Sequence, residues 1–352
     1  MSLGSTGRPT KPAIRFVART KIRMALIFTL ALSLPLPLPH AFDVAEATAA
    51  VPKRQAWPSE GKIWITNPQL RLIAERMNPL GKKAGDGALG LNVKFPNKQL
   101  VAHQVEGFQF IRSGLATKNG FVMDRGIMAF EWSFAKMKSD GSFGESKTIE
   151  ITHFLGLFAR SVYLLRAGGQ EARAQRLERL KPRLELSLKS SRSLLGERRW
   201  DQAERNSWQT PQRLQAAAAA FWIGKFLANP TLRQTSDAWL REALVRQRTD
   251  GWFPSPLPEN SAAAARSQSE AIDVLIGLAL ADPSFGALIR EPLGRAMQWL
   301  LRHKHHRTQK LSTLALAQYA ALAEAGLPAA AESAAQAKKA ARAALSTSPK
   351  KR

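Results

Sequence analysis

From about residue 107 onward, apolar residues recur three or four positions apart, which is the spacing of an α-helix with one buried face. The segment from Ile127 to Met137, for example, places Phe130, Phe134 and Met137 on one side. Almost no segment has the pattern that is typical of a strand. We therefore predict an all-α fold, with helices over residues 68–77, 107–113, 127–137, 150–167, 171–193, 212–227, 235–248, 269–280, 292–302 and 308–325.

One motif occurs twice, 110 residues apart, at the end of an apolar helix. Asp140-Gly141 is followed by Phe143, and Asp250-Gly251 is followed by Phe253. Glycine allows a turn with positive φ without a steric penalty, and the aspartate can cap the backbone that follows. A second apolar stretch follows each turn. Repetition of a helix–turn–helix unit predicts stacked helical hairpins, none of which buries its apolar face alone.

Gln247, Gly251, Trp252 and Phe253, which follow a helix containing Trp239, resemble the Gln–Trp motif of α/α-toroid proteins. These include terpenoid cyclases, prenyltransferases and the thioester domains of complement-like proteins. The turn over residues 247–254, after an alanine-rich helix, is most similar to exported bacterial proteins of the polysaccharide lyase and six-hairpin glycosidase kind. The resemblance covers about residues 120–325. It implies an α/α toroid, an incomplete barrel of helical hairpins, and it implies function only by analogy.

The N-terminal region has the pattern of a secretory signal peptide. Six basic residues precede an uncharged apolar run over residues 24–34, and small-residue cleavage sites follow over residues 45–49. The run is too short to span a bilayer as a helix; an uncleaved interfacial anchor is the alternative. We expect a periplasmic or secreted protein, organised as a signal peptide (1–47), an irregular segment (48–106), a toroid domain (107–327) and a basic low-complexity tail (328–352).

The balance of charge points to an anionic partner. The chain has 52 Lys and Arg against 27 Asp and Glu, a formal net charge of +25. Such a surface attracts polyanions over long range. For an exported protein, acidic polysaccharide, another envelope polyanion or an anionic membrane surface is more accessible than nucleic acid, which we do not expect as a partner.

The absence of certain residues excludes the chemistry of the better-known toroid proteins. The chain has no cysteine, so it lacks the zinc ligand of a prenyltransferase and the thiol of a thioester domain. It also lacks the Asp-x-Asp-Asp run with which a cyclase of the squalene–hopene type protonates an alkene. His303, His305 and His306 lie among basic residues, which oppose a cation, so we expect neither a metal nor a cofactor.

Polysaccharide cleavage remains. A lyase needs a neutraliser for the uronate carboxylate, a base and an acid, and the catalytic candidates are Asn119, His153, Arg160 and Asn206. Tyr163 lies ten residues after His153 on one predicted helix, in an apolar run that favours core packing.

A hydrolase instead needs two carboxylates at a fixed separation. Glu270 and Asp273 lie three residues apart on one predicted helix, from which both can face a cavity, but no pair of acids stands out.

The candidates for substrate binding are one arginine and three tryptophans, because guanidinium groups pair with carboxylates and indole rings stack on sugars. They are Arg125, Trp200, Trp208 and Trp252. Packing between hairpins is the alternative role of the aromatic residues.

The sequence thus predicts an exported protein that acts on an acidic polysaccharide by lyase or hydrolase cleavage. Related exported proteins carry a tyrosine-containing segment after the Phe-Pro turn, whereas residues 262–269 here contain no aromatic residue. This difference keeps the alternative open, a non-catalytic polyanion-binding or cell-envelope assembly protein.

Overall fold

The computed structural model describes residues 59–77, 87–95, 98, 100–190, 209–303, 310–324 and 331–347. All of them belong to one compact unit, Gln55–Arg352. The proposed signal peptide lies outside the described residues. The described residues form helices and connecting turns and include no strand, so the predicted all-α class is confirmed. None of the helices in the described ranges is long and apolar enough to cross a membrane.

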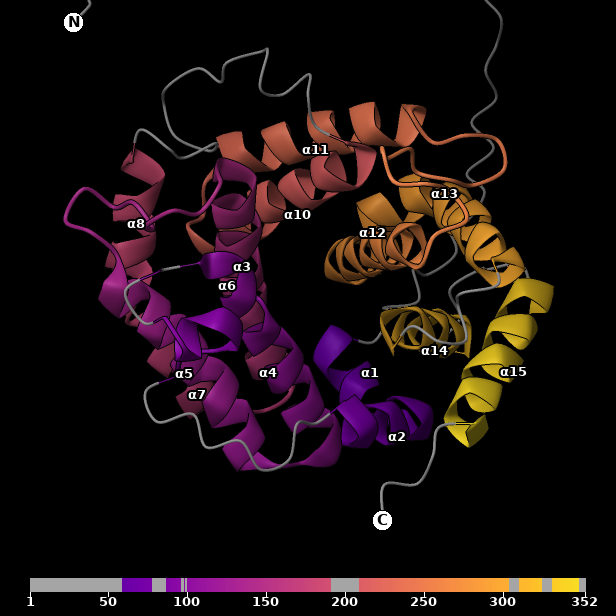
Figure 1. Cartoon of the computed structure of the whole chain (residues 1–352), viewed down its shortest axis with the longest axis horizontal. Coiled ribbons are helices and arrows are strands. Elements are labelled where there is room, and N and C mark those ends of the chain that lie inside the picture. Colours follow the sequence, from indigo (N-terminus) through magenta and orange to yellow (C-terminus); the bar gives the residue numbers. More distant parts are fainter. Residues whose placement is uncertain are drawn as a thin grey trace, which may run out of the picture. The chain divides into compact units, whose positions relative to one another are not determined.

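The helices follow one another along the chain (Figure 1). Their bounds are α1 Glu60–Thr66, α2 Pro68–Met77, the 3₁₀ turn η1 Gly90–Val93, α3 Val101–Gln104, α4 Glu106–Thr117, α5 Gly120–Lys136, α6 Thr148–Ala167, α7 Glu171–Glu178, α8 Lys181–Lys189, α10 Thr210–Phe226, α11 Pro230–Val245, α12 Ala262–Ala281, α13 Pro283–Arg302, α14 Lys310–Glu324 and α15 Ala331–Thr347.

Helices that are consecutive in the chain pack against each other in pairs: α4 with α5, α6 with α7, α10 with α11, α12 with α13 and α14 with α15. The first helix of each pair also contacts the first helix of the next pair. Thus α6 lies between α4 and α10, and α12 lies between α10 and α14. Helix α2 contacts both α14 and α4, and the short helix α1 contacts α4, α6 and α12 (Figure 1).

Small residues allow the closest of these contacts. A Cβ atom on Gly156 of α6 would lie 2.6 Å from the Cβ of Ala219 on α10. The run of alanines in α10 is almost completely buried against such neighbours. Between α5 and α6, phenylalanine rings fill the core instead, and those of Phe134 and Phe158 lie 5.0 Å apart edge to face. Small residues thus let α6 pack closely on α10, whereas aromatic rings fill the space between α5 and α6.

The repeated motif folds into the same turn twice. The backbone N–H of Lys138 donates to the carbonyl of Ser142 at 3.0 Å, and that of Arg248 donates to the carbonyl of Trp252 at 3.0 Å. Asp140 Oδ1 accepts from the N–H of Ser142 at 2.9 Å, and Asp250 Oδ1 accepts from the N–H of Trp252 at 3.1 Å. The prediction of a capped Asp-Gly turn is therefore confirmed in both copies.

A second repeated feature, with the same separation of 110 residues, joins the helices before each turn. Lys118 and Ala228 both adopt a left-handed backbone with φ of 54°. The next residues, Asn119 and Asn229, cap α5 and α11 through hydrogen bonds to the backbone N–H of Val122 and Leu232. The repeat therefore includes the hairpin that precedes the Asp-Gly turn, which the sequence pattern did not indicate.

Several helix boundaries differ from the predicted ones. The predicted helix over 171–193 is interrupted between α7 and α8, next to Pro182. Helix α13 begins at Pro283 and includes Pro292, where the predicted helix over 292–302 begins. The segment 48–106, for which one helix was predicted, also contains α1, η1 and α3. The tail contains α15, which packs on α13 and α14.

Replacing Gly251 with alanine is expected to lower the free energy of unfolding by about 3 kcal/mol. Alanine would be strained in this left-handed backbone conformation, and its Cβ atom would be packed too closely against α13. Its φ is +94°, and a Cβ atom would lie 2.0 Å from the carbonyl oxygen of Arg295 on α13. Gly169→Ala is the matched control, because Gly169 has φ of +71° but no described atom within 4 Å of the added Cβ. The control substitution should lower the free energy of unfolding by only about 1 kcal/mol. Urea unfolding followed by circular dichroism measures both, and equal losses would contradict the packing argument.

Candidate functional site

Helix α1 brings a carboxylate into the interior. Ser59 caps the helix, with its Oγ accepting from the N–H of Lys62 at 3.4 Å. Glu60 follows in the first turn and is only 8% exposed, because α4, α6 and α12 surround α1. Gly61 makes this approach possible, since a Cβ there would lie 2.8 Å from the backbone of α6. A buried carboxylate requires positive partners.

Two arginines provide them. Arg112 of α4 and Arg160 of α6 each place Nη2 2.8 Å from Glu60 Oε1, and Arg160 Nε donates to Oε2 at 3.0 Å. Asp273 of α12 closes the group: its Oδ1 lies 2.7 Å from Arg112 Nη1, an ion pair without hydrogen-bond geometry, and its Oδ2 lies 3.3 Å from Arg160 Nη1. We call Glu60, Arg112, Arg160 and Asp273 the buried ion cluster. Its formal charges cancel.

Aromatic rings and a glycine complete the surroundings of the two guanidinium groups. The ring of Phe108 lies 4.2 Å from the guanidinium of Arg112 and 4.9 Å from that of Arg160. The ring of Trp64 lies 5.1 Å from Arg112. A Cβ atom on Gly277 would lie 2.2 Å from Arg160 Nη2. The side chains are therefore fixed by cation–π contacts and by close packing as well as by charge.

The charges of the cluster shift the pKa values of its acids downward. Burial alone would raise the pKa of Glu60, but Arg160 and Arg112 outweigh it and hold the pKa below its ordinary value. Burial likewise opposes ionisation of Asp273, and Arg112 and Arg160 again prevail, helped by a hydrogen bond from Gln318 of α14. Both carboxylates are ionised at neutral pH.

Three half-buried side chains lie next to the cluster, and each of them interacts with Asp273 or with another of the three. His153 of α6 interacts electrostatically with both Asp273 and Arg160. Glu270 of α12 interacts with Asp273, accepts from Arg266 Nε at 3.2 Å and has Gln215 Nε2 of α10 at 3.5 Å. We call His153, Gln215 and Glu270, together with Asp273, the half-buried edge. It joins α6, α10 and α12.

At this edge burial decides the pKa values. It lowers the pKa of His153 to about 4, although Asp273 acts in the opposite direction. It raises the pKa of Glu270, and Arg266 only partly compensates because its side chain is 64% exposed. The edge therefore combines a neutral imidazole, a carboxyl group that holds its proton more strongly than usual, and an ionised carboxylate. Acid–base chemistry uses such a combination.

Of the residues proposed for catalysis, the structure brings His153 and Arg160 together and places Asn119 elsewhere. Arg160 is 2% exposed, and its guanidinium is occupied by Glu60 and Asp273. Asn119 caps α5. Asn206 lies outside the described residues. These placements do not test the proposed roles, which stay predictions.

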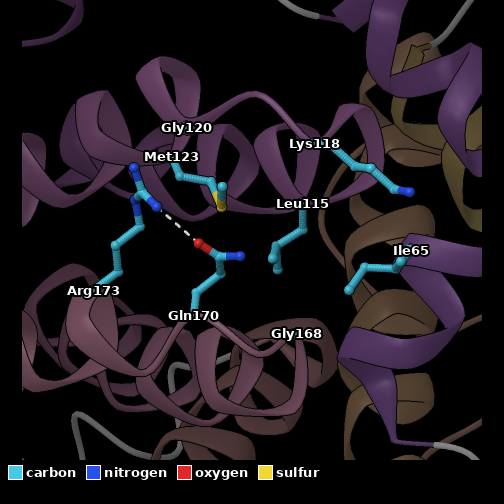
Figure 2. Close-up of a pocket in the computed structure, with 8 residues that line it drawn as sticks. All are labelled: Ile65, Leu115, Lys118, Gly120, Met123, Gly168, Gln170 and Arg173. Atoms are coloured by element: carbon cyan, nitrogen blue, oxygen red, sulfur yellow. Dashed lines mark hydrogen bonds between the residues drawn. The ribbon is translucent and has the colours of Figure 1, made fainter.

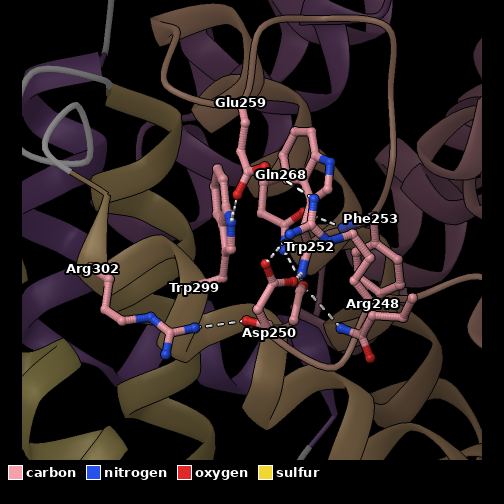
Figure 3. Close-up of polar contacts among 10 residues, drawn as sticks. Arg248, Asp250, Trp252, Phe253, Glu259, Gln268, Trp299 and Arg302 are labelled. Carbon is pink, nitrogen blue, oxygen red and sulfur yellow. Dashed lines mark hydrogen bonds and ion pairs between the residues drawn. The ribbon is translucent and has the colours of Figure 1, made fainter.

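The residues proposed for substrate binding do not converge. Arg125 of α5 lies over the ring of Phe110, at 5.2 Å from its centroid. Trp252 is 3% exposed, and its ring stacks on that of Trp299 at 4.6 Å. Figure 3 shows this stack beside Glu259 and Arg302. The ring of Trp252 thus has a packing contact with α13, which agrees with the alternative role predicted for the aromatic residues. Trp200 and Trp208 lie outside the described residues.

Two further candidates have neighbours of their own. The ring of Tyr163 lies 5.7 Å from that of Trp222, with the ammonium group of Lys225 4.7 Å from its centroid. His303 stacks on Trp299 at 4.7 Å, and its Nε2 lies 2.7 Å from the carbonyl oxygen of Glu259. Among the described residues, no group of histidine and acidic side chains is arranged to hold a metal ion; His305 and His306 lie outside them.

Sequence reasoning missed Glu60 and Arg112. Arg112 lies in an apolar run with Phe108, Ile111 and Leu115 at helical spacing. A charged residue on the buried face of a predicted helix indicates a buried ion pair, so the sequence contained a signal for Arg112. Glu60 carried no such signal, because it belongs to a short helix in a segment rich in proline and glycine.

Glu60→Gln is expected to lower the free energy of unfolding by about 3–5 kcal/mol, because it leaves two buried guanidinium groups with one carboxylate. The control is Glu291→Gln, whose side chain is 81% exposed and pairs with Arg295 on the same helix. That change should stay within about 0.5 kcal/mol. Denaturant unfolding measures both. A loss for Glu60→Gln as small as that of the control would show that the buried ion cluster contributes little to stability.

His153 predicts a specific pH dependence. The unfolded chain binds a proton at this side chain near pH 6.5, but the folded protein binds it only near pH 4. Between these values the unfolded state holds more protons, so stability falls as the pH falls. The wild type should therefore lose about 2 kcal/mol more than His153→Gln between about pH 7 and pH 4.5. Denaturant unfolding at both pH values measures the difference, and parallel losses would contradict the burial of a neutral imidazole.

Comparisons with protein families, curated proteins and solved structures find no match for this chain. Its function therefore has to follow from the arrangement of its own residues.

Proposed function

We propose that the helices form an α/α toroid, an incomplete barrel in which the first helix of each pair lines the inside and the second the outside. The series of contacts from α4 through α6, α10, α12 and α14 to α2, and back to α4, supports this proposal. So do the two repeated Asp-Gly turns, each of which follows the second helix of a pair. In this arrangement α1 contacts the inner helices α4, α6 and α12, which carry the other members of the buried ion cluster and, with α10, the half-buried edge.

We further propose that the protein is exported and cleaves an acidic polysaccharide, by hydrolysis in preference to elimination. One observation carries this proposal: Glu270 and Asp273, three residues apart on α12, have pKa values shifted in opposite directions, with His153 beside them. Titratable groups whose environments separate their pKa values are the mark of an acid–base site. A lyase also needs an acid, and Tyr163 of the same helix as His153 packs against Trp222.

In the proposed reaction, Glu270 gives its proton to the oxygen that leaves the sugar. Neutral His153 takes a proton from the attacking water, whose oxygen bonds to the anomeric carbon. Asp273 stays ionised through Arg112 and Arg160. Its carboxylate favours the protonated form of His153 that the reaction creates. Proton transfers of this kind contribute about 10²- to 10⁴-fold each to a rate.

The experiment is incubation of the purified protein with alginate, pectate and glycosaminoglycans. New reducing ends without an unsaturated product indicate hydrolysis. New reducing ends with the ultraviolet absorbance of an unsaturated uronate indicate elimination, and then His153 would act as the base that removes the proton beside the carboxylate.

Glu270→Gln should lower the rate of reducing-end formation by about 10²- to 10⁴-fold while the protein remains folded, because the amide cannot supply the proton. Its side chain is half-buried at the edge and outside the buried ion cluster, so the loss of stability should be small. Glu291→Gln on α13 is the matched control and should keep full activity, since its side chain is 81% exposed. An active Glu270→Gln protein would exclude Glu270 as the acid.

A non-catalytic polyanion-binding role is the second candidate, and one observation favours it. Arg179, Lys181, Arg183 and Lys189 are exposed on α7 and α8 or at their ends. Exposed cations of this kind suit an acidic glycan or an anionic membrane surface. A panel of glycans that stays uncleaved but binds tightly, with an affinity that falls as salt rises, would favour this function over catalysis.

A further inference from the structure

A separate cavity lies at the ends of five helices. It has a volume of about 470 Å³ (Figure 2). It is lined by Ile65 of α1, Leu115 of α4 and the α4 C-cap Lys118, Gly120 and Met123 of α5, the α6 C-cap Gly168, and Gln170 and Arg173 at the start of α7. This size is within the range of small-molecule sites. None of these residues belongs to the half-buried edge, so the cavity is independent of the proposed cleavage reaction.

The polar groups of the cavity leave one positive charge available. Arg173 donates to both carboxylate oxygens of Asp124 at 2.9 Å, which neutralises it. It also donates to Gln170 Oε1 at 2.7 Å, which leaves Gln170 Nε2 directed into the cavity (Figure 2). Lys118 is exposed at the rim, and within the described part of the chain its ammonium group has no acidic partner. One cation and one amide donor thus remain.

The remaining wall is apolar. The side chains of Ile65, Leu115 and Met123 face the same space as Gln170 (Figure 2). Leu115 and Met123 are almost fully buried. A sugar would find too few hydrogen-bond partners here, and a phosphate dianion would find only one available cation. The composition suits a molecule with one anionic group and an apolar body.

The internal repeat shows that the fold does not require this arrangement. The residue that corresponds to Lys118 is Ala228, which has the same φ of 54°. The residue that corresponds to Met123 is Arg233, whose guanidinium donates to Asp282 at 2.7 Å and lies 5.4 Å from the ring of Phe221. The second corner therefore has an internal ion pair where the first has a cavity and an available lysine.

We propose that this cavity binds a small organic monoanion with an apolar body, such as an aryl sulfonate or a medium-chain carboxylate. The anionic group pairs with Lys118 and accepts a hydrogen bond from Gln170 Nε2. The apolar body lies against Ile65, Leu115 and Met123.

The probe is 8-anilinonaphthalene-1-sulfonate, an apolar aryl monoanion whose fluorescence rises on transfer from water to an apolar site. Titration of the full chain should give one saturable site, and octanoate should displace the probe. Lys118→Ala, which introduces the residue found at the repeat position, should weaken binding about tenfold through loss of the charged contact. Lys136→Ala, an exposed lysine at the other end of α5, should leave the affinity within about twofold.

Ile65→Trp provides an independent test, because its indole fills the apolar part of the cavity without changing the charge. It should abolish the saturable site, while circular dichroism and thermal unfolding report an intact fold. Binding that is unchanged in both Lys118→Ala and Ile65→Trp would overturn the proposal, since the probe would then lie elsewhere. Loss of affinity in Lys136→Ala equal to that in Lys118→Ala would also overturn it, because only overall charge would matter.

Discussion

Two arginines with almost no exposure, Arg112 and Arg160, impose the main constraint on this fold. A guanidinium group cannot lose its proton in a protein, so its burial requires carboxylates at hydrogen-bonding distance. Glu60 comes from a helix 52 residues before Arg112, and Asp273 comes from a helix 113 residues after Arg160. The position of α1 among α4, α6 and α12 meets this requirement, because it brings Glu60 to both arginines.

Close packing and charge depend on each other in this region. Gly277 leaves the space that the guanidinium of Arg160 occupies, and Gly61 lets α1 approach the end of α6. Farther out, Gly141 and Gly251 let the two repeated turns press against the backbones of α8 and α13. In each case the absence of a side chain on glycine allows a neighbour to approach more closely. Glycine loses more backbone entropy on folding than other residues, and the close contact offsets this loss.

Asp273 links the buried ion cluster to the half-buried edge, and the physical balance changes across it. Beside Arg112 and Arg160, the attraction of two buried cations exceeds the effect of burial, and the carboxylate is ionised. One turn away, Glu270 has only the mostly exposed Arg266, and burial prevails. The same helix therefore carries a charged and a proton-retaining carboxyl group, because solvent screens one cation and not the other two.

Local sequence determined the helical class, the two Asp-Gly turns and the pairing of consecutive helices, because helical periodicity and turn chemistry act over a few residues. It also singled out His153, Arg160, Glu270 and Asp273 as candidates. Only the tertiary structure decided what these residues meet. Glu60 pairs with arginines 52 and 100 residues away, and the opposite pKa shifts of Glu270 and Asp273 depend on which cations are buried. The tryptophan of the repeated motif, Trp252, packs on Trp299 because α13 covers the turn. Long-range pairing and burial belong to the assembled fold, and no local pattern encodes them.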